Sequence, residues 1–114
     1  MTIQEMLEAI RENGGFTVDL DGKELPKRGY FVSMPGRERV YALEDLTEDR
    51  LSLYTATVPH DKLLGAWVDD GCVYLDASEH FTRKRDAIKA GRERGQKAIW
   101  DVAKGIAIFL DTPE

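Results

Sequence analysis

The chain has 114 residues, of which 42% are hydrophobic and 32% are charged, a size and composition typical of one compact domain. Its formal net charge of −5 at pH 7 is a small acidic excess, too small to indicate a nucleic-acid mimic or an acidic tail. The longest nearly apolar runs, residues 63–68 and 105–110, have six residues each, far fewer than the roughly 20 of a membrane-spanning helix. The N-terminal residues lack the features of a secretory signal, so we expect a cytoplasmic protein. Its length leads us to expect a single domain over residues 1–114.

The N-terminal segment predicts a helix followed by a strand. Thr2 and Glu5 form a capping box, and apolar residues recur at three- and four-residue spacing through residues 2–12. Gly14 and Gly15 end this helix. Residues 16–20 then alternate as a strand does, and the Asp21-Gly22 turn leads into a short irregular return that ends near Pro26.

The next two segments predict a hairpin and a second helix. Residues 29–43 contain two apolar runs separated by Pro35-Gly36, which indicates a hairpin closed at that turn. Thr47 is the expected cap of a helix with two acidic residues in its first turn. Pro59 ends or kinks this helix, and a final turn extends toward Leu64.

Residues 64–110 predict a unit of hairpin, helix and hairpin around which the chain is organised. The first hairpin, residues 64–75, has a loop at residues 69–71 that contains Gly71. A basic helix capped by Ser78 or Thr82 is expected to run to about Gly95. Residues 98–110 form the second hairpin, with its turn at residues 102–105, and residues 111–114 are expected to fray.

This order of elements predicts the fold class. Hairpins alternate with single helices, and the strand–helix–strand rhythm of a parallel sheet is missing. We therefore expect an α+β fold, a single domain whose mainly antiparallel sheet is built from hairpins and has about three helices covering one face. A sheet of this kind has an exposed edge strand, through which two copies could pair across a two-fold axis.

Several motifs of the chain resemble small uncharacterised proteins of actinobacterial phages and prophages. The shared elements are a helix that ends in Gly-Gly, a Gly-Tyr strand before a Pro-Gly turn, a Gly-Ala-Trp-Val-Asp-x-Gly hairpin, and a Gln-x-Ala-Ile-Trp-Asp strand after a helix. They match at Gly14, Gly15, Gly29, Tyr30, Pro35, Gly36, Gly65, Ala66, Trp67, Val68, Asp69, Gly71, Gln96, Ala98, Ile99, Trp100 and Asp101. The resemblance covers nearly the whole chain and implies a phage context, but that family has no assigned activity. The sequence TRKRD at residues 82–86 departs from it, because an acidic first helical turn is expected there.

Charge is distributed unevenly along the chain. Residues 83–97 contain seven basic and two acidic residues, a local charge of +5, which leaves 9 basic and 19 acidic residues elsewhere. Arg83, Lys84 and Arg85 would lie at the positive end of the helix dipole, where each cation costs about 0.3–1 kcal/mol. The segment has three interpretations: a solvated face neutralised by the remaining acidic residues, a contact for an acidic protein, or a contact for nucleic-acid phosphate.

Two further groups of side chains are candidates for a site. Trp67 and Trp100 could stack on a base or a sugar, although tryptophan in an alternating strand more often packs in a core or covers a sheet edge. Asp69, Asp76, Glu79 and His80 would need to converge in one pocket to act as an acid-base pair or a hard-ion site. Asp69 belongs to a turn and Asp76 to the far end of a strand, which argues against convergence.

The sequence thus favours a small non-enzymatic protein-binding module, and the resemblance implies a phage or prophage accessory protein that contacts a host or phage protein. It contains no metal-ligand cluster, phosphate loop or framed nucleophile, and we expect no metal and no cofactor. The alternatives are nucleic-acid binding through the basic helix, residues 82–97, and a small enzyme with the acidic site. The predicted partner-binding residues are Arg83, Arg85, Lys89, Arg92, Lys97 and Trp67.

Overall fold

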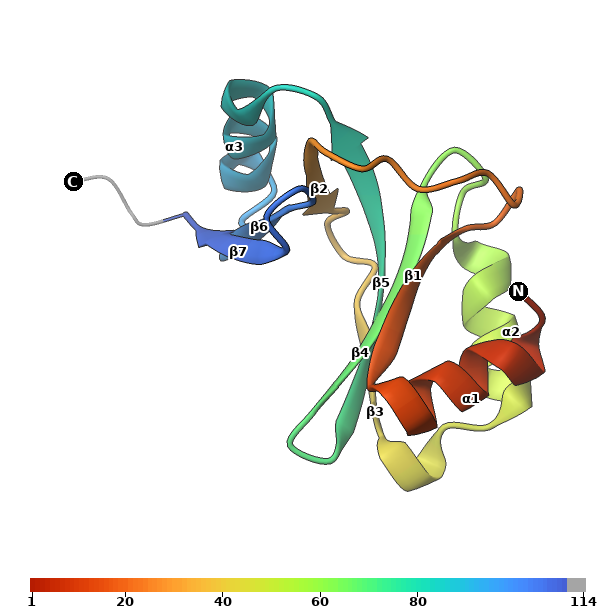
Figure 1. Cartoon of the computed structure of the whole chain (residues 1–114). Coiled ribbons are helices and arrows are strands. Elements are labelled where there is room, and N and C mark those ends of the chain that lie inside the picture. The colour runs from red at the N-terminus through yellow and green to blue at the C-terminus, as the bar shows by residue number, and fades with distance from the viewer. Residues whose placement is uncertain (111–114) are drawn as a thin grey trace.

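In a computed structural model, which describes residues 1–110, one seven-stranded sheet forms the centre of the protein (Figure 1). The strand order is β1-β4-β5-β2-β6-β7, and β3 also pairs with β5. The strands are β1 (Gly15–Asp19), β2 (Tyr30–Ser33), β3 (Arg39–Ala42), β4 (Leu63–Asp69), β5 (Cys72–Phe81), β6 (Ala98–Asp101) and β7 (Ile106–Phe109). The helices are α1 (Ile3–Asn13), α2 (Glu48–Thr57) and α3 (Lys84–Glu93), with a 3₁₀ turn, η1 (Leu43–Asp45).

All three α-helices cover the same face of this antiparallel sheet, which confirms the predicted fold class. Leu75 and Ala77 alternate on β5 and pack with residues of α1 and α2. Glu79 comes next on that face, and its register partner Val32 packs against α3. Figure 1 shows α1 and α2 beside one end of the twisted sheet and α3 beside the other. We call this the helix face and the opposite side the open face.

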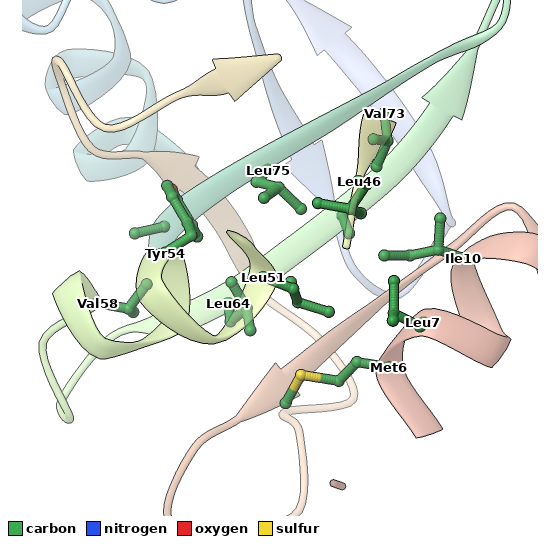
Figure 2. Close-up of a cluster of buried hydrophobic side chains, with 12 residues drawn as sticks. Met6, Leu7, Ile10, Leu46, Leu51, Tyr54, Val58, Leu64, Val73 and Leu75 are labelled. Atoms are coloured by element: carbon green, nitrogen blue, oxygen red, sulfur yellow. The ribbon is translucent and has the colours of Figure 1, made fainter. Parts of the chain in front are cut away.

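The core consists of two hydrophobic clusters on the helix face. The larger lies between α1, α2 and the β4–β5 hairpin, and Figure 2 shows its side chains pointing toward one another from these elements. The smaller lies under α3 and contains Val32, Ala87, Ala90 and Ile99. The clusters are adjacent along β5, so a single strand contributes to both.

Local sequence signals predicted several elements correctly. The Thr2 hydroxyl accepts a hydrogen bond from the Glu5 amide at 3.1 Å, and the Glu5 carboxylate accepts one from the Thr2 amide at 2.7 Å. Asp70 and Gly71, with φ of 51° and 76°, form the two-residue turn between β4 and β5, as expected for an Asp-Gly hairpin loop. The second hairpin, β6–β7, is also confirmed.

The predicted hairpin over residues 29–43 is wrong. β2 and β3 do not pair with each other; both pair with β5, Ser33 opposite Ser78 and Arg39 opposite Leu75. The two strands therefore run in the same direction, end to end along one edge of β5. The Pro35-Gly36 turn lets the chain bulge out between them, and the ten residues of β5 are long enough to pair with both.

The end of the second helix agrees with the prediction, but the final turn expected after Pro59 does not form. α2 ends at Thr57, before Pro59, and β4 begins at Leu63, so no helical turn extends to Leu64. The irregular return after β1 is confirmed, since no strand is assigned between Asp19 and Tyr30. The fraying expected of residues 111–114 lies outside the described residues. Within residues 1–110, no helix has the length and apolar character needed to cross a membrane.

Candidate functional site: the cationic surface of helix α3

Helix α3 packs closely on the sheet through small residues. Its buried positions are Ala87, Ala90 and Gly91. A Cβ atom built on Gly91 would lie 2.5 Å from Leu110 Cδ1 and 3.0 Å from Ile99 Cγ2. Because the buried side is so small, most of the helix circumference remains in solvent.

The predicted start of this helix is wrong. Ser78 lies within β5 and Thr82 precedes the cap position, which is occupied by Arg83. Arg83 has extended φ and ψ angles, and its side chain makes no capping hydrogen bond. Ser78 cannot serve as the cap because β5 continues to Phe81, where it pairs with Tyr30. The helix thus begins with cations at the positive end of its dipole and with Asp86 as the one acid of its first turn.

The five basic residues predicted to bind a partner are all exposed, and they line the outer side of α3 and its two ends. The helical spacing of Arg85, Lys89 and Arg92 places them on one stripe. Together with Ile88 and Glu93, these three line a shallow groove of about 420 Å³. Arg83 lies at the N-cap and Lys97 just beyond the C-terminal end. We call this set the cationic surface: Arg83, Arg85, Lys89, Arg92 and Lys97, all of which are exposed.

No member of the cationic surface forms an ion pair within residues 1–110, where all carboxylate oxygens lie more than 4.0 Å from its nitrogens. The acidic excess of the chain is therefore distributed elsewhere and does not neutralise these cations through direct contacts. Helix α3 itself contains two acidic residues, Asp86 and Glu93.

Arg94 is the exception among the basic residues of this segment. Its guanidinium donates to the Glu79 carboxylate and lies over the Phe81 ring, 5.6 Å from the centroid. The Lys62 ammonium lies 3.7 Å from the same carboxylate. Glu79 lies on β5 between the residues of the two hydrophobic clusters. The contacts of Arg94 and Lys62 with Glu79 are therefore located at the boundary between the clusters. Arg94 therefore contributes to the packing of the two halves and not to the cationic surface.

Trp67 is not part of the cationic surface. It pairs with Tyr74 across the β4–β5 hairpin, and the two rings stack at 5.3 Å with an interplanar angle of 7°. Its register places it on the open face, opposite α3. Trp67 is 41% exposed and is therefore not a core residue; with Tyr74 it forms an exposed aromatic pair. Trp100, similarly exposed, also lies on the open face, opposite Phe31.

The four residues of the alternative acidic site do not line one pocket. Glu79 points to the helix face, whereas Asp76 and His80 alternate onto the open face. Asp69 is exposed at the far end of the hairpin. The described residues contain no cluster of His, Cys, Asp and Glu that could hold a metal ion. The sequence argument against convergence is confirmed.

Asp76 has a different environment, which the sequence did not indicate. It is 8% exposed and accepts a hydrogen bond from the Ser33 hydroxyl at 2.6 Å. Burial raises the pKa of its carboxyl. A cavity of about 310 Å³ adjoins it at the interruption between β2 and β3. Asp76 adjoins this cavity because β2 and β3 both pair with β5, and no local sequence pattern indicates that pairing.

Ile88 is the residue of the candidate site that is missing from the predicted partner-binding set. Ile88 is half-buried: it contacts the smaller cluster and also lines the groove. Its spacing of three and four residues from Arg85 and Arg92 was the available signal. The groove therefore combines an apolar contact at Ile88 with three cations and one acid, Glu93.

Comparisons with protein-family models, with curated proteins and with solved structures give no significant match.

Proposed function

We propose that the protein is a small binding module that holds an acidic segment of a partner protein against the cationic surface of α3. The observation that carries this proposal is a set of five exposed cations, none paired within residues 1–110. Three of them, Arg85, Lys89 and Arg92, line a shallow groove together with Ile88 and Glu93. Cations at the start of a helix lower its stability. A partner carboxylate placed there would offset that cost.

The groove favours an acidic protein segment over nucleic-acid phosphate. Ile88 offers an apolar contact that phosphate does not use, whereas an acidic segment with one or two apolar side chains complements both Ile88 and the cations. The chain as a whole has a net charge of −5, so a long duplex would be repelled by surfaces away from α3. The resemblance to phage and prophage proteins suggests that the partner is a host or phage protein.

Affinity capture of the tagged protein from host lysate, with and without nuclease, tests this proposal. The test variant carries Arg85→Glu and Lys89→Glu. The control carries Lys23→Glu and Lys27→Glu, which make the same change of net charge at exposed positions of the β1–β2 loop. We expect a captured protein that survives nuclease, is retained by the control and is lost with the test variant, while both variants keep the melting temperature within a few degrees.

Two results would count against this function. Equal capture by the test and control variants would remove α3 from the interface. Binding to a generic DNA duplex that falls steeply with salt, together with loss of capture after nuclease, would instead favour the nucleic-acid alternative, because displacement of counterions makes phosphate contacts strongly salt-dependent.

A further inference from the structure

The outer edge of β7 is a free sheet edge within the described chain. β7 is the last strand of the sheet and pairs only with β6 (Figure 1). The Leu110 amide donates to the Lys97 carbonyl at 2.8 Å, in register with the β6–β7 pair. Hydrogen-bonded and non-bonded pairs alternate along an antiparallel ladder. Ile106 and Ile108 therefore bond toward β6, whereas the amides and carbonyls of Ala107 and Phe109 point outward.

The side chains of β7 make this edge unusually apolar. Phe109 is 71% exposed and Ile106 is 50% exposed. The strand Ile106–Phe109 contains no charge and no proline, the devices by which proteins commonly protect an edge. β3, by comparison, begins with Arg39, and β1 ends with Asp19 and has only half-buried residues.

We propose that β7 pairs with β7 of a second copy of this chain, antiparallel and across a two-fold axis at Ile108. In this register Ala107 lies opposite the partner's Phe109, and Phe109 lies opposite the partner's Ala107. Four backbone hydrogen bonds form between the copies, two at each pair. This is the one alignment in which both outward-facing residues bond to residues of β7 itself; a shift in either direction moves one bonded pair off the strand.

The same register covers the exposed apolar side chains. Ile108 meets the partner's Ile108 at the non-hydrogen-bonded position, where side chains come closest. Ile106 lies opposite the partner's Leu110 on the helix face, and Phe109 packs beside the partner's Ala107 on the open face. Every large apolar residue of β7 thus gains a cross-strand neighbour.

The dimer would have one continuous sheet with the helices of both copies on the same side, because the two-fold axis is perpendicular to the sheet. Each copy keeps its own cationic surface on α3, since β7 does not contribute to the groove. This inference is independent of the proposed function and concerns a different surface.

Sedimentation equilibrium of the full chain tests the dimer, from roughly 10 µM to roughly 500 µM because an interface of two short strands is small. We expect a reversible monomer–dimer equilibrium. Ala107→Pro removes an outward amide without breaking a β6–β7 bond, and Phe109→Lys adds a charge at an exposed position. Each variant should be monomeric with an unchanged melting temperature, whereas Trp67→Lys, at an exposed aromatic on another part of the sheet, should still dimerise.

Cysteine cross-linking tests the register. In a Cys72→Ser background, Ile108→Cys should form a disulfide-linked dimer in a mild redox buffer, because the two-fold axis places the cysteine beside its own copy. Ala107→Cys should not, since it faces the partner's Phe109. A wild-type chain that stays monomeric at every concentration, a dimer unaffected by both Ala107→Pro and Phe109→Lys, or cross-linking through Ala107→Cys alone would overturn the proposal.

Discussion

Replacing Asp76 by asparagine is expected to stabilise the protein at neutral pH. The carboxylate is almost fully buried, accepts one side-chain hydrogen bond, from Ser33, and has no cation within 4.0 Å among the described residues. A carboxylate can accept about four hydrogen bonds, so most of its solvation is lost on folding. Asparagine keeps the oxygen that accepts from Ser33 and removes the charge.

We expect a gain of about 1–2 kcal/mol in the free energy of unfolding at pH 7.5, the usual range for relieving an incompletely bonded buried polar group. In a domain of this size, 1 kcal/mol corresponds to about 4–8 °C of melting temperature. The asparagine amide needs a partner of its own, and the adjoining cavity gives it access to water. That access limits the gain to the lower part of the range.

The gain should depend on pH in a defined direction. Burial raises the pKa of Asp76 in the folded state above its ordinary value of 3.8. Below 3.8 the group is protonated in both states, and its contribution to stability is fully present. As pH rises through the folded-state pKa the wild-type protein loses that contribution, whereas the asparagine variant does not. The two proteins should therefore have similar stability in acid and diverge toward neutral pH.

Urea unfolding followed by tryptophan fluorescence at several pH values measures this difference. Asp69→Asn is the matched control, because Asp69 lies in the same hairpin and is exposed, and its effect should stay within about 0.5 kcal/mol. A less stable Asp76→Asn protein at pH 7.5, or a stability difference that does not change with pH, would refute the account of Asp76 as a costly buried charge.

Three further predictions, made with five substitutions, test the local physics of the fold. Gly15→Ala should cost more than about 3 kcal/mol in thermal unfolding, because φ is +147° and the new Cβ would collide with backbone; Gly14→Ala, with φ of +80° and open space around it, should cost only about 1 kcal/mol. Arg85→Glu should raise stability by about 0.3–1 kcal/mol and Arg92→Glu should lower it by a similar amount, since they lie at opposite ends of the α3 dipole; shifts of the same sign would show that another interaction dominates. Thr2→Ala should cost about 1 kcal/mol through loss of the α1 cap, and an unchanged melting temperature would contradict that role.

Elements whose signals are local were predictable from the sequence. The Thr2–Glu5 capping box and the Asp70-Gly71 turn act over two or three residues, so short-range chemistry decides them. The Pro35-Gly36 turn has equally clear local chemistry but does not close a hairpin. What decides its role is the length of β5, which offers a partner to the strands on both sides of the turn. The sequence of residues 29–43 alone does not show that both strands pair with β5 and not with each other.

The candidate site was predictable to the same extent. The concentration of basic residues in residues 83–97 indicated the cations that the structure shows to be exposed. The ion pair between Arg94 and Glu79 was not predictable, because the register of β5 with β2 is what places Glu79 on the helix face. The separation of Trp67 from the cationic surface likewise follows from strand alternation across the whole sheet, which a single hairpin pattern does not define.

The pairing pattern of the sheet also bears on how the chain emerges during translation. β1 pairs with β4, β3 pairs with β5, and β2 pairs with β5 and β6, so no strand before residue 63 pairs with another from that part of the chain. At about 5–20 residues per second, synthesis of the first 62 residues takes roughly 3–12 s. During that time the apolar side of α1 and three strand segments leave the ribosome without their partners. Nascent chains of this protein should therefore be bound by chaperones that recognise unfolded apolar segments until the β4–β5 hairpin has emerged.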